Sequence, residues 1–208
     1  MNIIGNNCIG GFIYKYANIP YSNPFIWTGI YGSSLEYILT HFNSINFNNV
    51  CLYDVSGNYD YNVVVDNKLD VSFWRHYKYS LSAGYQQIIN DTIYSNDIGN
   101  FILNTYHKRL QRMTEPPTFV IHWWAGLSTC VPEYWKTTPP TNDFLYLTSL
   151  IHKNFDHKVI IFGPYKEINP TGNNVFYIYD ETCAERTNGP AIVAQKHLSD
   201  VLHIINEI

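Results

Sequence analysis

The chain has 208 residues, of which 46% are hydrophobic and only 14% are charged, and its formal net charge is −4. This composition excludes a disordered or fibrous chain, and the length suits a single domain over residues 1–208. The acidic balance argues against nonspecific binding to nucleic acid, which depends on Lys and Arg, and no apolar run approaches the roughly 20 residues that a membrane span needs.

The first stretch, residues 2–14, predicts a strand, a tight turn and the start of a helix. The apolar pair Ile3-Ile4 is followed by Gly5 and two asparagines, and Cys8 then precedes small residues and an aromatic segment. Cys8 therefore lies where a strand ends and a helix begins. Ligands bind at the carboxyl ends of strands in open α/β sheets, and a helix N-terminus favours a thiolate. One interpretation is a reactive thiol, and the alternative is a small buried residue that fills space.

A packed, irregular loop is predicted over residues 20–32. Prolines and glycines interrupt regular structure there, while large aromatic side chains, among them Trp27, favour burial. We expect this loop to lie close to Cys8. A helix follows, with Ser33 or Ser34 as its N-cap and apolar residues at helical spacing as far as Phe42.

Three short β-like runs come next, and the turn-forming cluster Asp66-Asn67-Lys68 lies between the last two. That cluster predicts a β-hairpin. The three runs are residues 50–54, 61–65 and 70–76.

The second half of the chain alternates strands with helices, which indicates right-handed βα units. We therefore predict an α/β fold, with a three-layer α/β/α arrangement around a mostly parallel mixed sheet and a β-hairpin insertion. A long helix at 96–113 is stopped by two prolines, and its residues Lys108, Arg109 and Arg112 are expected to face outward. The other predicted elements are strands at 118–124, 158–162 and 175–180 and helices at 142–155 and 190–207.

A cysteine nucleophile needs a base, most often a histidine that a carboxylate or an amide orients. His76 is the first candidate, because it ends a strand-like run and lies beside Trp74 and Arg75. His122 is the second, at the carboxyl end of a central strand. The alternatives are a surface histidine at 76 and a core histidine at 122. The other six histidines lie on predicted helices or helix ends and are assigned no catalytic role.

The third catalytic group has three candidates, each of which ends or follows a strand: Asp54, Asp66 and Asp180. The sequence does not distinguish among them, and we include Asp54 in the predicted site. The backbone N–H groups after Cys8 are the expected oxyanion site.

The four cysteines are scattered without a CxxC pair, and neither a phosphate-cradling motif nor a metal-ligand pattern is present. We therefore predict a reducing, cytoplasmic location, no cofactor and no metal. The expected partner is a small-molecule, glycan or peptide substrate.

Over residues 3–124, the chain resembles an uncharacterised family described as papain-like cysteine peptidases. The resemblance depends on five segments in a fixed order: a cysteine, a Pro-Phe-x-Trp loop, a helix, a strand that ends in histidine, and a basic helix. The resemblance implies roles as nucleophile and base for Cys8 and His76. The stretch at residues 6–14 is also similar to an uncharacterised family labelled exopolysaccharide biosynthesis proteins. The five segments are Gly5-Asn6-Asn7-Cys8, Pro24-Phe25-Ile26-Trp27, Ser34-Leu35-Glu36-Tyr37-Ile38, Val71-Ser72-Phe73-Trp74-Arg75-His76 and Tyr106–Met113.

The leading hypothesis is a cysteine-dependent hydrolase or acyl transferase. A second is a glycan-assembly glycosyltransferase, in which two glycines and a basic helix hold a sugar nucleotide, and a third is a noncatalytic carbohydrate-binding protein. The basic stretch 107–112, which the second hypothesis assigns to the sugar nucleotide, can also be interpreted as the solvent-exposed face of a helix. The predicted catalytic residues are Cys8, His76 and Asp54, and the predicted substrate-binding residues are Asn7, Gly10, Gly11, Trp27, Trp74, His122 and Arg109.

Overall fold

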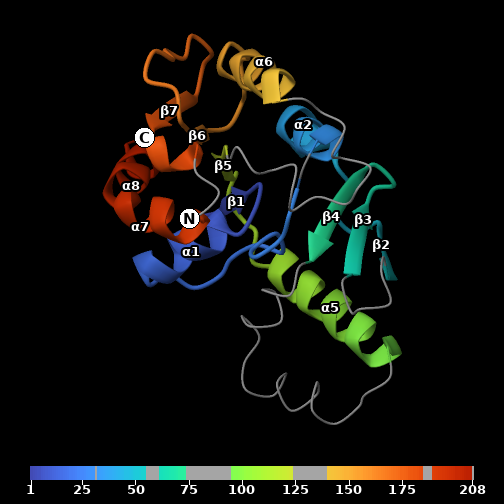
Figure 1. Ribbon diagram of the computed structural model, residues 1–208. Coiled ribbons are helices and arrows are strands. Elements are labelled where there is room, and N and C mark those ends of the chain that lie inside the picture. The colour runs from blue at the N-terminus through green and yellow to red at the C-terminus, as the bar shows by residue number, and fades with distance from the viewer. Residues whose placement is uncertain (31, 55–60, 74–94, 124–139, 185–188, 208) are drawn as a thin grey trace.

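The computed structural model describes residues 1–30, 32–54, 61–73, 95–123, 140–184 and 189–207. Within them, four parallel strands form one sheet and three antiparallel strands form another (Figure 1). The α/β fold predicted from the sequence is confirmed, and the predicted hairpin belongs to the separate antiparallel sheet.

The parallel sheet has the strand order β1-β5-β6-β7. Its two inner strands have apolar residues at consecutive central positions, and every residue of both is buried. Such runs are typical of parallel sheets that helices cover on both faces. The four strands are β1 (Ile3–Gly5), β5 (Thr118–His122), β6 (Val159–Gly163) and β7 (Val175–Tyr179).

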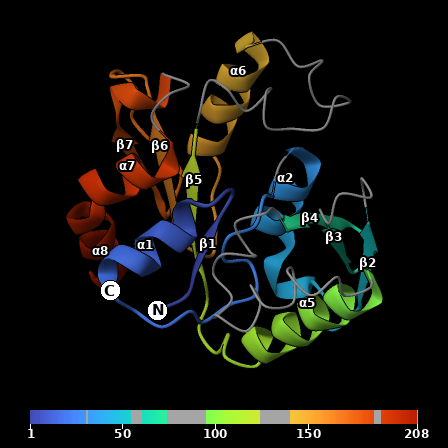
Figure 2. The same cartoon turned by 60° about the horizontal axis from the view of Figure 1, so that its bottom comes forward.

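Helices cover this sheet on two sides. In Figures 1 and 2, α1 (Ile9–Ala17) lies with α7 (Pro190–Lys196) and α8 (Leu198–Asn206), against which it packs. The other side carries α6 (Pro140–Ile151) and α2 (Gly32–His41), and Lys153, in the segment after α6, forms an ion pair with Glu36 of α2. The sheet and its two helical sides make the three predicted layers.

The antiparallel sheet comprises β2 (Val50–Asp54), β3 (Tyr61–Val65) and β4 (Leu69–Phe73). Asp66 and Asn67 turn the chain between β3 and β4 with φ of 55° at both residues, which is the type I′ geometry that matches the twist of a hairpin. The helix α2 packs on β4, and α5 (Ser95–Leu110) lies beside this sheet in both views.

Three local predictions are wrong. The helix α2 begins at Gly32, so Ser33 and Ser34 lie inside its first turn and neither precedes it as a cap. The predicted single helix at 190–207 is two helices that break at His197, whose ring binds carboxylates on either side of the break. Arg109 is only 6% exposed and lies over the ring of Tyr21, because α5 buries that side against the loop before α2.

Candidate active site at the carboxyl edge of the parallel sheet

Cys8 lies between the end of β1 and the start of α1, as the sequence predicts. Its backbone is already helical, with φ of −60° and ψ of −5°, and its carbonyl accepts the N–H of Phe12. The residue is only 4% exposed. The unpaired N–H groups and dipole of a helix N-terminus stabilise a thiolate at this position, whereas the burial of the residue opposes it.

The side chain of Asn6 joins β1 to the end of β5. Its Oδ1 accepts the backbone N–H of His122 at 2.8 Å, and its Nδ2 donates to the carbonyl of His122 at 3.4 Å. The backbone of Asn6 adds two more links, to the carbonyl of Val120 and from the N–H of Ile30. Because Asn6 is 2% exposed, these bonds form in a protected interior where an unmade bond is costly.

Asn7 fixes the tautomer of His122. Its Oδ1 accepts the N–H of Ile9 at 3.0 Å, so it must present Nδ2 to the Nδ1 atom of His122, 3.3 Å away. Nδ1 is therefore the accepting nitrogen, and a neutral His122 carries its proton on Nε2. Asn7 thus connects the first turn of α1 to the end of β5.

His122 is fully buried, and burial lowers the pKa of its ring to about 4, although the carboxylate of Asp180 acts in the opposite direction. The ring is therefore neutral near pH 7. A base with so low a pKa takes a proton from a thiol poorly at that pH. The geometry suits His122 to orienting Asn7 better than to general-base catalysis.

A second polar cluster lies two strands further along the same edge, where Asp180 follows β7. Its carboxylate accepts hydrogen bonds from Thr182, from Nε2 of His197 at 2.7 Å, and from Lys196, whose Nζ lies 3.2 Å away. Burial opposes ionisation, but the bonds from Thr182, His197 and Lys196 outweigh it and lower the pKa of Asp180 to about 2. The other ring nitrogen of His197 binds Asp200 at 3.1 Å.

The two glycines of the predicted site lie against other parts of the chain. A Cβ on Gly10 would come within 3.0 Å of the backbone nitrogen of Gly5, and one on Gly11 within 2.4 Å of the Trp27 ring. Small residues at these positions therefore let α1 approach both β1 and the loop before α2. Close packing explains both glycines without a ligand.

Trp27 lies in an unusual conformation beside α1. Its φ is 66°, a left-handed value that costs a bulky residue energy, and its ring meets that of Phe12 edge-on at 4.8 Å. Among the described residues nothing accepts a hydrogen bond from its buried indole N–H. The Trp27 ring lies against Gly11 and Phe12, one helical turn after Cys8. Backbone strain together with an unused hydrogen-bond donor is typical of a binding position.

The structure does not bring the candidate aspartates Asp54 and Asp66 to Cys8. Asp54 ends β2, and Asp66 begins the turn after β3, both in the antiparallel sheet on the far side of the molecule from α1 (Figures 1 and 2). His76 and Trp74 lie outside the described residues. The expected oxyanion site is partly occupied, because the N–H of Ile9 already donates to Asn7.

Sequence reasoning missed two residues of this edge. Asn6 lies within the stretch that was singled out, yet nothing local marks it as the partner of a strand more than a hundred residues away. His197 was placed inside a helix because its apolar neighbours keep helical spacing. An aspartate three residues later was the available signal that its ring has a polar partner.

In comparisons with known proteins, no family model, no curated protein and no solved structure matches the chain. Both family resemblances therefore stay predictions. Among the described residues, no helix is long and apolar enough to cross a membrane, and no three metal-ligating side chains cluster.

Proposed function

We propose that the chain is a cysteine-dependent hydrolase or acyl transferase with Cys8 as its nucleophile. One observation carries the proposal: Cys8 is the N-cap residue of α1 at the carboxyl edge of a parallel sheet, where Asn6, Asn7 and His122 hold the β1–α1 turn in one geometry. Ligand sites of open α/β sheets lie at this edge, and nucleophiles must be held firmly in order to react.

In the proposed reaction, the Cys8 thiolate attacks the carbonyl carbon of an ester, thioester or amide. A C–S bond forms, the bond to the leaving alcohol, thiol or amine breaks, and the base returns the thiol proton to that leaving group. Water or a second acceptor then attacks the thioester and releases the thiolate. We assign the base to His76, since the low pKa of His122 suits it to the positioning of Asn7.

The contacts of Gly10, Gly11 and Arg109 favour this proposal over a sugar-nucleotide transferase. That alternative needs these residues to face a ligand, yet protein atoms fill the space beside both glycines, and Arg109 is buried over Tyr21. Of the three candidate carboxylates, Asp180 shares the sheet edge with Cys8 and is the better supported third group.

The rate of iodoacetamide labelling at each cysteine, measured against pH by peptide mass spectrometry, tests the proposal. Cys51 is an exposed internal reference, and buried Cys183, with a pKa raised to about 12, is a slow one. We expect Cys8 to react fastest, with an apparent pKa below the usual value of about 8.5. The variant His76→Ala should raise that pKa, and His122→Gln should change it less.

A Cys8 that reacts more slowly than Cys51 at every pH would refute the nucleophile assignment. An equal effect of His76→Ala and His122→Gln would instead keep the nucleophile and overturn the choice of base.

A further inference from the structure

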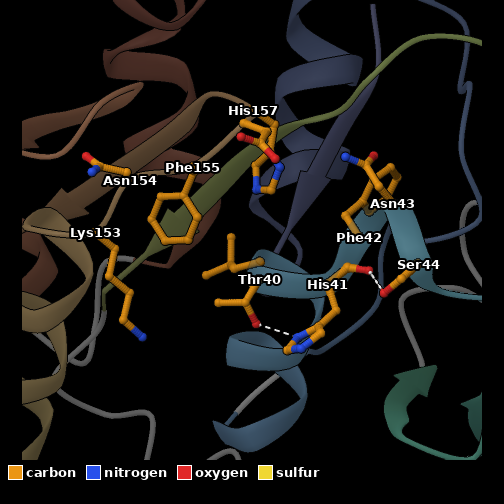
Figure 3. A pocket seen from close by; sticks show the side chains of 11 residues that line it. Thr40, His41, Phe42, Asn43, Ser44, Lys153, Asn154, Phe155 and His157 are labelled. Carbon is orange, nitrogen blue, oxygen red and sulfur yellow. Dashed lines mark hydrogen bonds between the residues drawn. The ribbon is translucent and has the colours of Figure 1, made fainter.

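A cavity of about 340 Å³ opens at the amino edge of the parallel sheet, on the opposite edge from Cys8 (Figure 3). It lies between the carboxyl end of α2 with the following turn, Phe42–Ser44, and the segment 153–157 that leads into β6. Pockets for small molecules measure roughly 300 to 1,000 Å³, so this one suits a ligand of a single ring.

Phe42 and Phe155 line the cavity beside His157, and Phe119, which is outside the lining, packs against the imidazole. The imidazole centroid lies 4.5 Å from that of Phe119, 5.6 Å from that of Phe155 and 6.3 Å from that of Phe42. In Figure 3 the rings of Phe155 and His157 face the central space, whereas the side chain of Asn154 points away from it. The cavity therefore has aromatic rings on its inner side, beside the polar groups of its rim.

His157 brings one unused polar atom to this inner side. Its Nε2 is buried and has no hydrogen-bond partner among the described residues. Burial lowers the pKa of the ring, with Asp156 acting weakly in the opposite direction, so the ring has little tendency to be charged. An unpaired buried nitrogen is unfavourable, and a ligand that supplies a hydrogen bond would remove that penalty.

The rim supplies further hydrogen-bonding groups. Asn43 and Ser44 are exposed at the opening. The hydroxyl of Thr40 donates to the carbonyl of Glu36, so it must accept from Nδ1 of His41 at 2.7 Å. Nε2 of a neutral His41 is then an acceptor. The rim therefore offers both donors and acceptors.

The charges around the cavity balance. Lys153 is paired with Glu36 at 2.9 Å, and exposed Asp156 is the other charged lining residue. This arrangement gives neither a cation nor an anion a clear advantage.

From these features we propose that the cavity binds a neutral, hydroxyl-rich ring, namely one monosaccharide unit of a glycan. The C–H face of a sugar would cover the aromatic rings, while its hydroxyl groups would pair with His157 and with the amide, hydroxyl and imidazole groups of the rim. The proposal does not rest on Cys8 chemistry, because the two sites lie at opposite edges of the sheet.

Imidazole NMR of the full chain, titrated with methyl β-D-glucopyranoside, tests this inference. We expect a saturable shift of the His157 resonances, with a Kd on the order of 1 mM as befits a single ring. The signals of exposed His203, on α8, should not move. Cyclohexanol, which has one hydroxyl group, and the anion benzoate are the matched probes and should not saturate the site.

Two variants localise the binding. His157→Phe keeps an aromatic ring and removes Nε2, and Asn43→Ala trims the exposed rim. Each should weaken sugar binding about tenfold, measured from the resonances of His41 on the rim, whereas Asn48→Ala, an exposed asparagine outside the cavity, should not. Absence of a saturable shift at about ten times that Kd overturns the site. Equal binding of cyclohexanol or benzoate overturns the assignment to a sugar.

Discussion

The two edges of the parallel sheet each contain a histidine whose pKa is lowered by burial, the fully buried His122 at the carboxyl edge and the half-buried His157 at the amino edge. They differ in their partners. Nδ1 of His122 accepts a hydrogen bond from Asn7, which also binds the start of α1, whereas His157 is surrounded by phenylalanine rings and its Nε2 has no partner among the described residues.

This difference separates two ways in which a buried polar group contributes to a site. At the carboxyl edge the asparagines and the histidine satisfy one another, so they fix the position of Cys8 and stabilise the fold at the same time. At the amino edge the unsatisfied nitrogen adjoins an open cavity, so it lowers stability but leaves a group that a ligand can use. Three stability measurements test this difference between the two edges.

The largest effect is expected for Asn6→Ala. Removal of this side chain breaks its two hydrogen bonds to the buried backbone of His122, at about 1 to 3 kcal/mol each, so unfolding in urea should become easier by about 2 to 6 kcal/mol. Asn48→Ala, at an exposed position, is the control and should change little. A loss below about 1 kcal/mol would mean that the network does not hold the edge together.

The second effect is a loss of stability in mild acid. His122 has a pKa of about 4 in the folded chain and an ordinary value of 6.5, so between these pH values the unfolded chain binds more protons. Stability should therefore fall as pH drops from 6.5 towards 4, by up to about 3 kcal/mol from this group. Asp180 has a pKa of about 2 in the folded chain, so its contribution to stability is lost only below pH 3.8. It therefore does not affect the pH range in which His122 is tested.

Urea unfolding at pH 7 and at pH 4.5 measures this term. The readout is the difference in the free energy of unfolding between pH 7 and pH 4.5, because His122→Gln also changes stability at neutral pH. In the His122→Gln variant the free energy of unfolding should depend less on pH. An unchanged pH dependence would show that another group is responsible for it. His157 acts in the same direction, so the double variant with His157→Phe should be flatter still.

Local patterns made much of the carboxyl edge predictable. The Ile3-Ile4 pair, Gly5 and the small residues after Cys8 are consecutive, so their strand, turn and helix follow from neighbouring residues alone. The same holds for the hairpin, because Asp66 and Asn67 tolerate the left-handed conformation that its turn requires.

Contacts between distant segments could not be predicted in this way. The aromatic cluster around His157 joins Phe42, Phe119 and Phe155, which belong to three separate segments, and no periodicity connects them. Arg109 looked exposed because its neighbours in the helix are charged, yet Tyr21, from a distant loop, covers it. Both cases depend on tertiary packing, which a single sequence does not encode as a local pattern.

The smallest effect has the most informative sign. His157→Phe replaces a ring whose Nε2 is unpaired by one that lacks polar atoms, so the folded chain should gain about 1 kcal/mol at pH 7. The same substitution at His122 removes the partner of Asn7 and should cost about 1 to 3 kcal/mol. Urea unfolding of the two variants therefore tests the contrast directly. If His157→Phe is also destabilising, the nitrogen has a partner in the folded chain, and the amino edge is held together in the same way as the carboxyl edge.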